Sequence, residues 1–147
     1  MKHGILLLSL IATSFACFAQ KNDTQFRISW NKQLLLQKNS LAIKDTPVVK
    51  IKNIWLGKNT PLPVYFKQGE KRTGWKRTFQ FTDILNNVVF QRVFDSTEGN
   101  FNFTTSDIKP FLQKHRRMLL YTFQQPENSM LNGIRTERYL LCKLILE

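Results

Sequence analysis

Cationic and aromatic side chains alternate closely in one segment of this chain, and together they could hold an anionic ligand. Lysine and arginine flank Trp75, and a second group of cations follows further along the sequence. A cationic side chain pairs with phosphate or carboxylate, while an exposed aromatic ring stacks on a sugar or a base. The candidate anion-binding residues are Lys67, Lys71, Arg72, Trp75, Lys76, Arg77, Lys114, Arg116 and Arg117.

The same segment has a purely structural interpretation. Trp75 shares strand parity with Phe79 and Phe81, and residues of one parity face the same side of a sheet. This parity favours a Trp75 that points into the core while the charges surround a loop. The sequence contains no signature of a known RNA- or DNA-binding module, which disfavours a dedicated nucleic-acid function.

Residues typical of catalysis or metal binding are few and scattered. The chain has no nucleophile elbow, no phosphate-binding loop and no Cys/His spacing of a zinc site. His115 lies between cations that depress its proton affinity, so we predict a surface histidine. Cys142 alternates with leucines, which predicts a small buried side chain. We therefore predict no catalytic residue, no metal site and no cofactor.

The N-terminal segment has the three-part pattern of a secretory signal peptide: a basic head, an apolar run and small residues. We predict a signal peptide over residues 1–19, with cleavage between Ala19 and Gln20. Cleavage after Ala16 is an alternative, and a lipid anchor on Cys17 is possible but disfavoured by the residues that precede it. The protein is then exported to the periplasm, the cell surface or the extracellular space, with no transmembrane segment.

The remaining residues, 20–147, are long enough for one domain with one hydrophobic core. The formal net charge of +12 becomes +11 after cleavage, because only Lys2 is lost. Such a charge attracts anionic partners. Cys142 becomes the single cysteine, so the domain must fold without an internal disulfide.

Strand-like alternation runs through most of this domain, with turn residues between the strands. Residues 68–74 look like the tip of a hairpin, Pro61 and Pro63 favour a turn or a sheet edge, and a bulge is expected near Asn53. One short helical turn is expected near residues 106–114. The expected strands span residues 24–30, 48–56, 62–67, 75–81, 87–94, 101–103, 118–123 and 138–146, and residues 40–43 are a candidate for a further short strand.

About seven to eight strands of this kind predict an all-β fold, an antiparallel β-sandwich. The order of a strand, a helical turn, a strand, a long loop and a final strand resembles the end of an immunoglobulin-like domain, in which a helical turn often precedes the penultimate strand. A small β-barrel is the alternative fold.

From these features we expect an exported, non-catalytic binding module. Its partner would be an envelope or extracellular protein, or an anionic polymer bound by the basic surface. Two alternatives remain: a structural subunit of a surface assembly, and a small enzyme whose catalytic groups converge only in the fold.

Overall fold

The computed structural model describes residues 24–41, 46–69, 72–128 and 137–147. The predicted signal peptide and its cleavage site at Ala19 and Gln20 lie outside the described residues, as do Cys17 and Lys71. Among the residues that are described, no helix is both long and apolar enough to cross a membrane.

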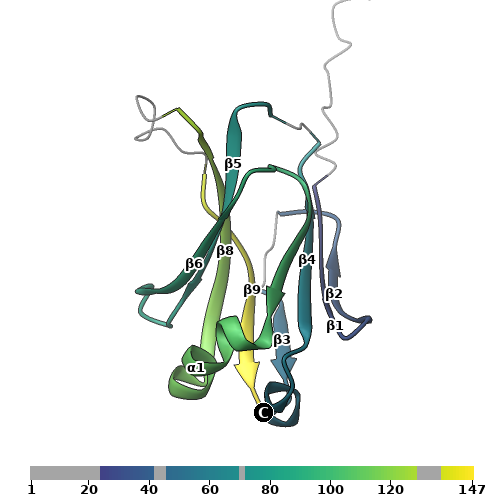
Figure 1. The fold of residues 1–147 in the computed structure, drawn as a ribbon, viewed down its shortest axis with the longest axis vertical. Coiled ribbons are helices and arrows are strands. Elements are labelled where there is room, and N and C mark those ends of the chain that lie inside the picture. Colours follow the sequence, from purple (N-terminus) through teal and green to yellow (C-terminus); the bar gives the residue numbers. More distant parts are fainter. Residues whose placement is uncertain (1–23, 42–45, 70–71, 129–136) are drawn as a thin grey trace, which may run out of the picture.

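Two β-sheets face each other and form a sandwich (Figure 1), and no closed barrel is present in the described part of the chain. The predicted all-β sandwich is therefore confirmed. One sheet has the order β2-β1-β4-β7 and the other the order β3-β9-β8-β5-β6. All neighbouring strands are antiparallel except β3 and β9. The strands are β1 (Gln25–Trp30), β2 (Gln33–Lys38), β3 (Val48–Ile51), β4 (Pro61–Lys67), β5 (Trp75–Thr82), β6 (Val88–Phe94), β7 (Gly99–Thr104), β8 (Arg117–Pro126) and β9 (Tyr139–Leu146).

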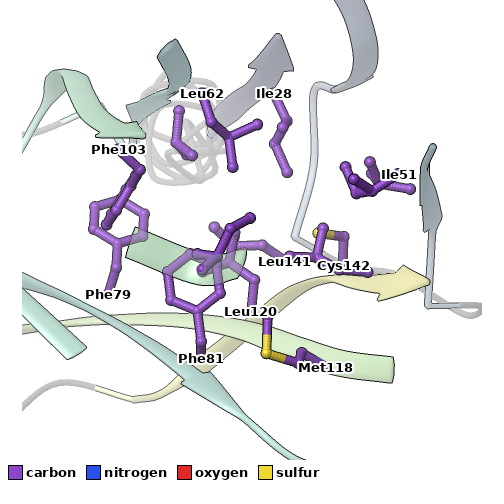
Figure 2. Close-up of a cluster of buried hydrophobic side chains, with 14 of the residues drawn as sticks. Ile28, Ile51, Leu62, Phe79, Phe81, Phe103, Met118, Leu120, Leu141 and Cys142 are labelled. Atoms are coloured by element: carbon purple, nitrogen blue, oxygen red, sulfur yellow. The ribbon is translucent and has the colours of Figure 1, made fainter. Parts of the chain in front are cut away.

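Alternating apolar residues of both sheets form the core between them. The rings of Phe79 and Phe81, from β5, meet the ring of Phe103, from β7, with centroids 5.6 and 5.4 Å apart. Figure 2 shows these rings in the same cluster of buried side chains as Cys142, which is fully buried. The prediction of a small buried cysteine is confirmed. Because aromatic rings in edge-to-face contact attract each other beyond their burial, these contacts join the two sheets.

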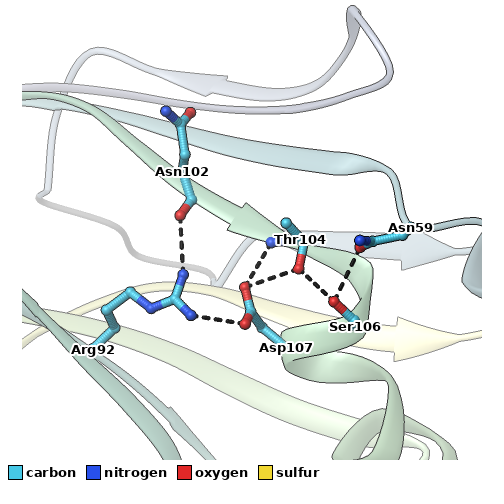
Figure 3. Close-up of polar contacts among 6 residues, drawn as sticks. All are labelled: Asn59, Arg92, Asn102, Thr104, Ser106 and Asp107. Atoms are coloured by element: carbon cyan, nitrogen blue, oxygen red, sulfur yellow. Dashed lines mark hydrogen bonds and ion pairs between the residues drawn. The ribbon is translucent and has the colours of Figure 1, made fainter.

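The predicted helical turn is a helix of three turns, α1 (Thr105–His115). Thr104 and Asp107 form a capping box, in which Asp107 Oδ2 accepts a hydrogen bond of 2.8 Å from the Thr104 N–H. The other oxygen of Asp107 pairs with Arg92 of β6 at 2.7 Å, so this carboxylate links the helix to the five-stranded sheet (Figure 3).

The predicted hairpin over residues 68–74 is wrong. β4 pairs with β1 and β7, whereas β5 pairs with β6 and β8, so this loop passes from one sheet to the other. The two strands face each other across the core, with Phe66 on one side and Phe79 on the other, both fully buried. Alternation shows which face of a strand is buried, but it does not show which strand lies beside it.

Pro61 and Pro63 lie inside β4, which has a neighbour on each side, and do not mark a turn or an edge strand. β1 pairs only with residues 64–67, so the proline half of β4 has β7 as its single partner. A missing N–H is tolerated there because no second ladder needs it.

The second strand also differs from the prediction. It is β2, residues 33–38, and not residues 40–43; Ser40 and Leu41 lie outside any strand and residues 42–43 lie outside the described residues. Asn31 and Lys32, with φ of 45° and 66°, form a two-residue turn of the kind that starts a hairpin.

The third strand ends at Ile51 and not at Leu56. The predicted bulge near Asn53 is instead a short 3₁₀ helix, η1 (Asn53–Gly57). The slip in alternation at this point marks the end of the strand.

Asp107 should make the stability of the domain sensitive to acid. Burial alone would raise its pKa, but hydrogen bonds from Thr104 and Arg92 bring the pKa below its ordinary value. A lowered carboxyl pKa stabilises the fold at neutral pH, and this stabilisation is lost as the pH falls below the ordinary value of 3.8. We expect Asp107→Asn to cost about 1 kcal/mol at neutral pH and much less near pH 3, by thermal denaturation.

Asp95→Asn is the matched control, because the Asp95 side chain is 91% exposed and pairs with Lys76 at 3.1 Å. Equal losses from both substitutions at neutral pH would contradict the proposed role of Asp107.

Candidate functional site

The structure separates the two basic segments of the sequence. Trp75 pairs with Pro126 at the far end of β8, whereas Arg117 begins that strand beside α1. Nine residues of extended chain span about 30 Å, so Lys114, Arg116 and Arg117 lie far from the cations around Trp75. The predicted anion-binding residues therefore do not form one continuous surface.

Arg77 is fully buried, although the sequence places it in a basic segment. Its Nε donates to the Thr97 carbonyl oxygen at 2.5 Å, and its terminal nitrogens donate to Thr122 Oγ1 and Gln68 Oε1, each at 3.2 Å. The guanidinium lies 4.0 Å from the ring centroid of Phe66. Burial lowers the pKa of Arg77 to about 9, an effect opposed by the charge of Glu98. Arg77 thus belongs to the interior and cannot touch a surface polymer.

The neighbours of Arg77 are engaged with other side chains. Lys76 lies 3.1 Å from Asp95 and 3.1 Å from Glu127, and hydrogen bonds to these two carboxylates raise its pKa. The guanidinium of Arg72 lies 5.0 Å from the ring centroid of Trp75. Lys67, at the end of β4, is exposed. Among the described cations of this segment, Lys67 and Arg72 form no ion pair with a carboxylate.

A more complete site lies on the outer face of the four-stranded sheet. Four residues oppose one another in register across all four strands: Gln37 pairs with Arg27, Arg27 with Tyr65, and Tyr65 with Asn100. The Arg27 guanidinium lies 4.4 Å from the ring centroid of Tyr65. This row crosses a shallow hollow of about 330 Å³, which is lined by Arg27, Ser29, Leu34, Gln37, Pro63, Tyr65 and Asn100.

The charge of this sheet has one sign. Its four strands contain Arg27, Lys38 and Lys67 but neither aspartate nor glutamate. An anion in the hollow therefore meets no repelling carboxylate on the strands beneath it. The amides of Gln37 and Asn100 can donate and accept hydrogen bonds beside the cation and the ring.

Part of this site could be predicted from the sequence. Gln25, Arg27 and Ser29 alternate with Phe26 and Ile28, so the polar face of β1 is readable from the sequence. The pairing of β1 with β2 and β4 is not, and only that pairing brings Gln37, Tyr65 and Asn100 beside Arg27. The sequence therefore gave no indication that these residues form one row.

The residue types that often serve in catalysis or metal binding can each be placed in the structure. Among the described residues, no group of three or more His, Cys, Asp or Glu side chains is placed to hold a metal ion. His115 is partly exposed at the end of α1. Burial raises the pKa of the Cys142 thiol, which keeps it protonated and unreactive.

Substitution of Arg77 tests its assignment to the interior. Arg77→Gln removes three hydrogen-bond donors and leaves buried acceptors without partners, so we expect a loss of at least about 2 kcal/mol in the free energy of unfolding. Arg72→Gln carries the same charge change on an exposed residue and should leave stability nearly unchanged. Chemical denaturation compares the two, and equal stabilities would place Arg77 at the surface.

Thiol titration tests the burial of Cys142. In the folded protein we expect Cys142 to resist an aromatic disulfide reagent, and in denaturant we expect it to react fully. Rapid reaction of Cys142 in the folded state would contradict the structure. A second reactive thiol would show that Cys17 is retained.

No protein-family model and no curated protein sequence matches this chain. The interpretation of the site therefore depends on the row across the four-stranded sheet and on the chemistry of its side chains.

Proposed function

We propose that the protein is an exported, non-catalytic binding module that binds an acidic polysaccharide on the outer face of its four-stranded sheet. The observation that carries this proposal is the row of Gln37, Arg27, Tyr65 and Asn100 across the hollow. The Tyr65 ring can stack on a sugar face, and Arg27 can pair with a carboxylate or sulfate. The two amides can hydrogen-bond sugar hydroxyls.

The positive charge of the chain supports an anionic ligand over a neutral one. The formal net charge is +12, and the four strands of the site add no negative charge. Such a surface attracts a polyanion over several ångströms before contact. Dissolved salt screens the charges, so this attraction weakens as the salt concentration rises.

An immunoglobulin-like topology is part of the proposal. In that fold one sheet contains neighbouring strands B and E, and the other has the order C-F-G. Here β4 and β7 are neighbours in one sheet, β5, β8 and β9 follow one another in the other, and α1 precedes β8, the penultimate strand. These correspondences support β4 as strand B, β7 as strand E, and β5, β8 and β9 as strands C, F and G.

Export is the third part of the proposal. It is supported by the basic head, the apolar run and the small residues that precede Gln20, the pattern of a cleaved signal peptide. Acidic polysaccharides occur at cell surfaces, so an exported module could meet one at its site of action.

Binding of an acidic polysaccharide, measured by calorimetry at several salt concentrations, tests the site. We expect Arg27→Gln and Tyr65→Ala each to weaken binding at least about tenfold, because each removes a charge-assisted or stacking contact made only in the hollow. Lys143→Gln, on β9 of the other sheet, makes the same charge change as Arg27→Gln and should alter binding little.

Equal weakening by Arg27→Gln and Lys143→Gln would reduce the interaction to general charge attraction and contradict the proposed site. Binding insensitive to salt would exclude the electrostatic mechanism. Capture of an envelope protein that is lost in the Arg27 and Tyr65 variants, without polysaccharide binding, would reassign the same face to a protein partner.

A further inference from the structure

The large apolar side chains most exposed to solvent belong to two elements that lie on either side of α1. Among the described residues, Ile54 is 78% exposed, Leu85 76% and Ile84 61%. Ile54 belongs to η1, and the other two belong to the turn between β5 and β6. Figure 1 shows α1 and η1 at one end of the sandwich, which we call the helix end, with the β5–β6 turn at its side next to α1.

Hydrogen bonds hold these elements together at the helix end. The Asn53 N–H donates to the Glu147 carbonyl oxygen at 2.8 Å, and the Leu146 N–H donates to the Arg116 carbonyl oxygen at 2.9 Å. The end of β9 thus connects η1 to the end of α1. The ring of Phe111 in α1 packs on Phe90 of β6, with centroids 6.1 Å apart.

The β5–β6 turn is built to present its apolar residues rigidly. Asp83 Oδ1 accepts hydrogen bonds from the Leu85 N–H at 2.8 Å and the Asn87 N–H at 2.9 Å, and Oδ2 accepts from the Asn87 side chain. Tyr121 Oη donates to Asn86 Oδ1 at 2.9 Å, which fixes the turn to β8. Side chains that protrude from a fixed turn lose little backbone entropy when they bind.

Cations lie at the same end of the sandwich as these apolar residues. Arg117 begins β8, and Ile84 lies in the turn after β5; each is two residues beyond the pair Leu119–Thr82, toward the same end of the sheet. Lys114 lies in the last turn of α1, and Arg116, with a left-handed φ of 60°, is the residue that caps the C-terminus of this helix. In the part of the chain that the structure describes, none of Lys114, Arg116 and Arg117 pairs with a carboxylate.

The carboxylates of the helix end are already engaged. Asp107 pairs with Arg92 at 2.7 Å, and Glu147 pairs with Lys50 at 2.5 Å. Asp83 accepts the hydrogen bonds of the turn. The unpaired charges of Lys114, Arg116 and Arg117 therefore give this end an excess of positive charge.

We propose that the helix end docks onto a membrane surface rich in anionic lipid, with Ile54, Ile84 and Leu85 entering the headgroup region and Lys114, Arg116 and Arg117 contacting the headgroups. Aliphatic side chains on separate protruding elements suit a deformable lipid phase, whereas protein interfaces favour aromatic anchors in fitted pockets. Apolar insertion and cationic attraction add to each other at such surfaces.

Vesicle sedimentation with the processed chain tests this docking. We expect binding to mixed phosphatidylglycerol and phosphatidylcholine vesicles, with little binding to pure phosphatidylcholine. Lys114→Gln, Arg116→Gln and Arg117→Gln together should reduce binding at least about tenfold, because each cation near an anionic surface contributes about fivefold. The same substitutions at Lys38, Lys67 and Arg72, toward the opposite end, should reduce it much less.

The apolar contribution has its own matched pair. Ile84→Ser with Leu85→Ser should reduce vesicle binding at least about fivefold. Val93→Ser, at a residue 43% exposed on the outer face of β6, should leave binding nearly unchanged. Circular dichroism melts establish that each variant is folded.

A third measurement does not depend on variants of the docking residues. Trp55 follows Ile54 in η1 and stacks on Trp30 with centroids 5.4 Å apart, whereas Trp75 lies toward the other end. In a Trp75→Phe background, lipids with brominated acyl chains should quench the tryptophan fluorescence.

Equal binding to both kinds of vesicle, absence of quenching, or unchanged binding by the folded Ile84 and Leu85 variant would each overturn the proposal. Self-association that these same substitutions abolish, without any vesicle binding, would assign the helix end to a second copy of the chain.

Discussion

The attraction between aromatic rings across the core is the interaction on which the rest of the structure depends. Phe79 of β5 contacts Phe101 and Phe103 of β7, with centroids 4.8 and 5.6 Å apart, and Phe94 of β6 contacts both. β6 and β7 follow each other in the chain but belong to different sheets. Their rings therefore close one side of the sandwich without a disulfide, and both outer faces remain available for other contacts.

A buried cation closes the end of the sandwich opposite α1. Arg77 receives partners from three places: Gln68 before β5, Thr97 between β6 and β7, and Thr122 on β8. A buried guanidinium is costly unless hydrogen-bond acceptors surround it, so the loops that carry these acceptors must keep their positions. Gln68 is held further, because its N–H donates to Glu98 Oε1 at 2.7 Å.

Much of the fold could be predicted from local pattern. The strands with strict alternation and the buried Cys142 were predictable, because burial of one face imposes a period of two on the residues themselves. A helical segment near residues 106–114 was also predicted, but its start at Thr105, its cap at Thr104 and its third turn were not. The partners of β4 and β5 were not predictable, since pairing is decided by contacts distant in sequence. Arg77 shows a conflict between two local signals. An arginine is usually exposed, but Arg77 shares strand parity with Phe79 and Phe81, and the structure buries all three.

The candidate site shows why function was harder to predict than fold. Its row of Gln37, Arg27, Tyr65 and Asn100 draws one residue from each of four strands, so no window of sequence contains it. The strands run from the helix end to the opposite end, so this row lies on the side of the molecule and not at its tip. A chain that rests on a membrane by its helix end would hold its strands roughly upright and its four-stranded face open to the surrounding medium. The two proposed surfaces therefore do not compete for space, and one molecule could carry both contacts at once.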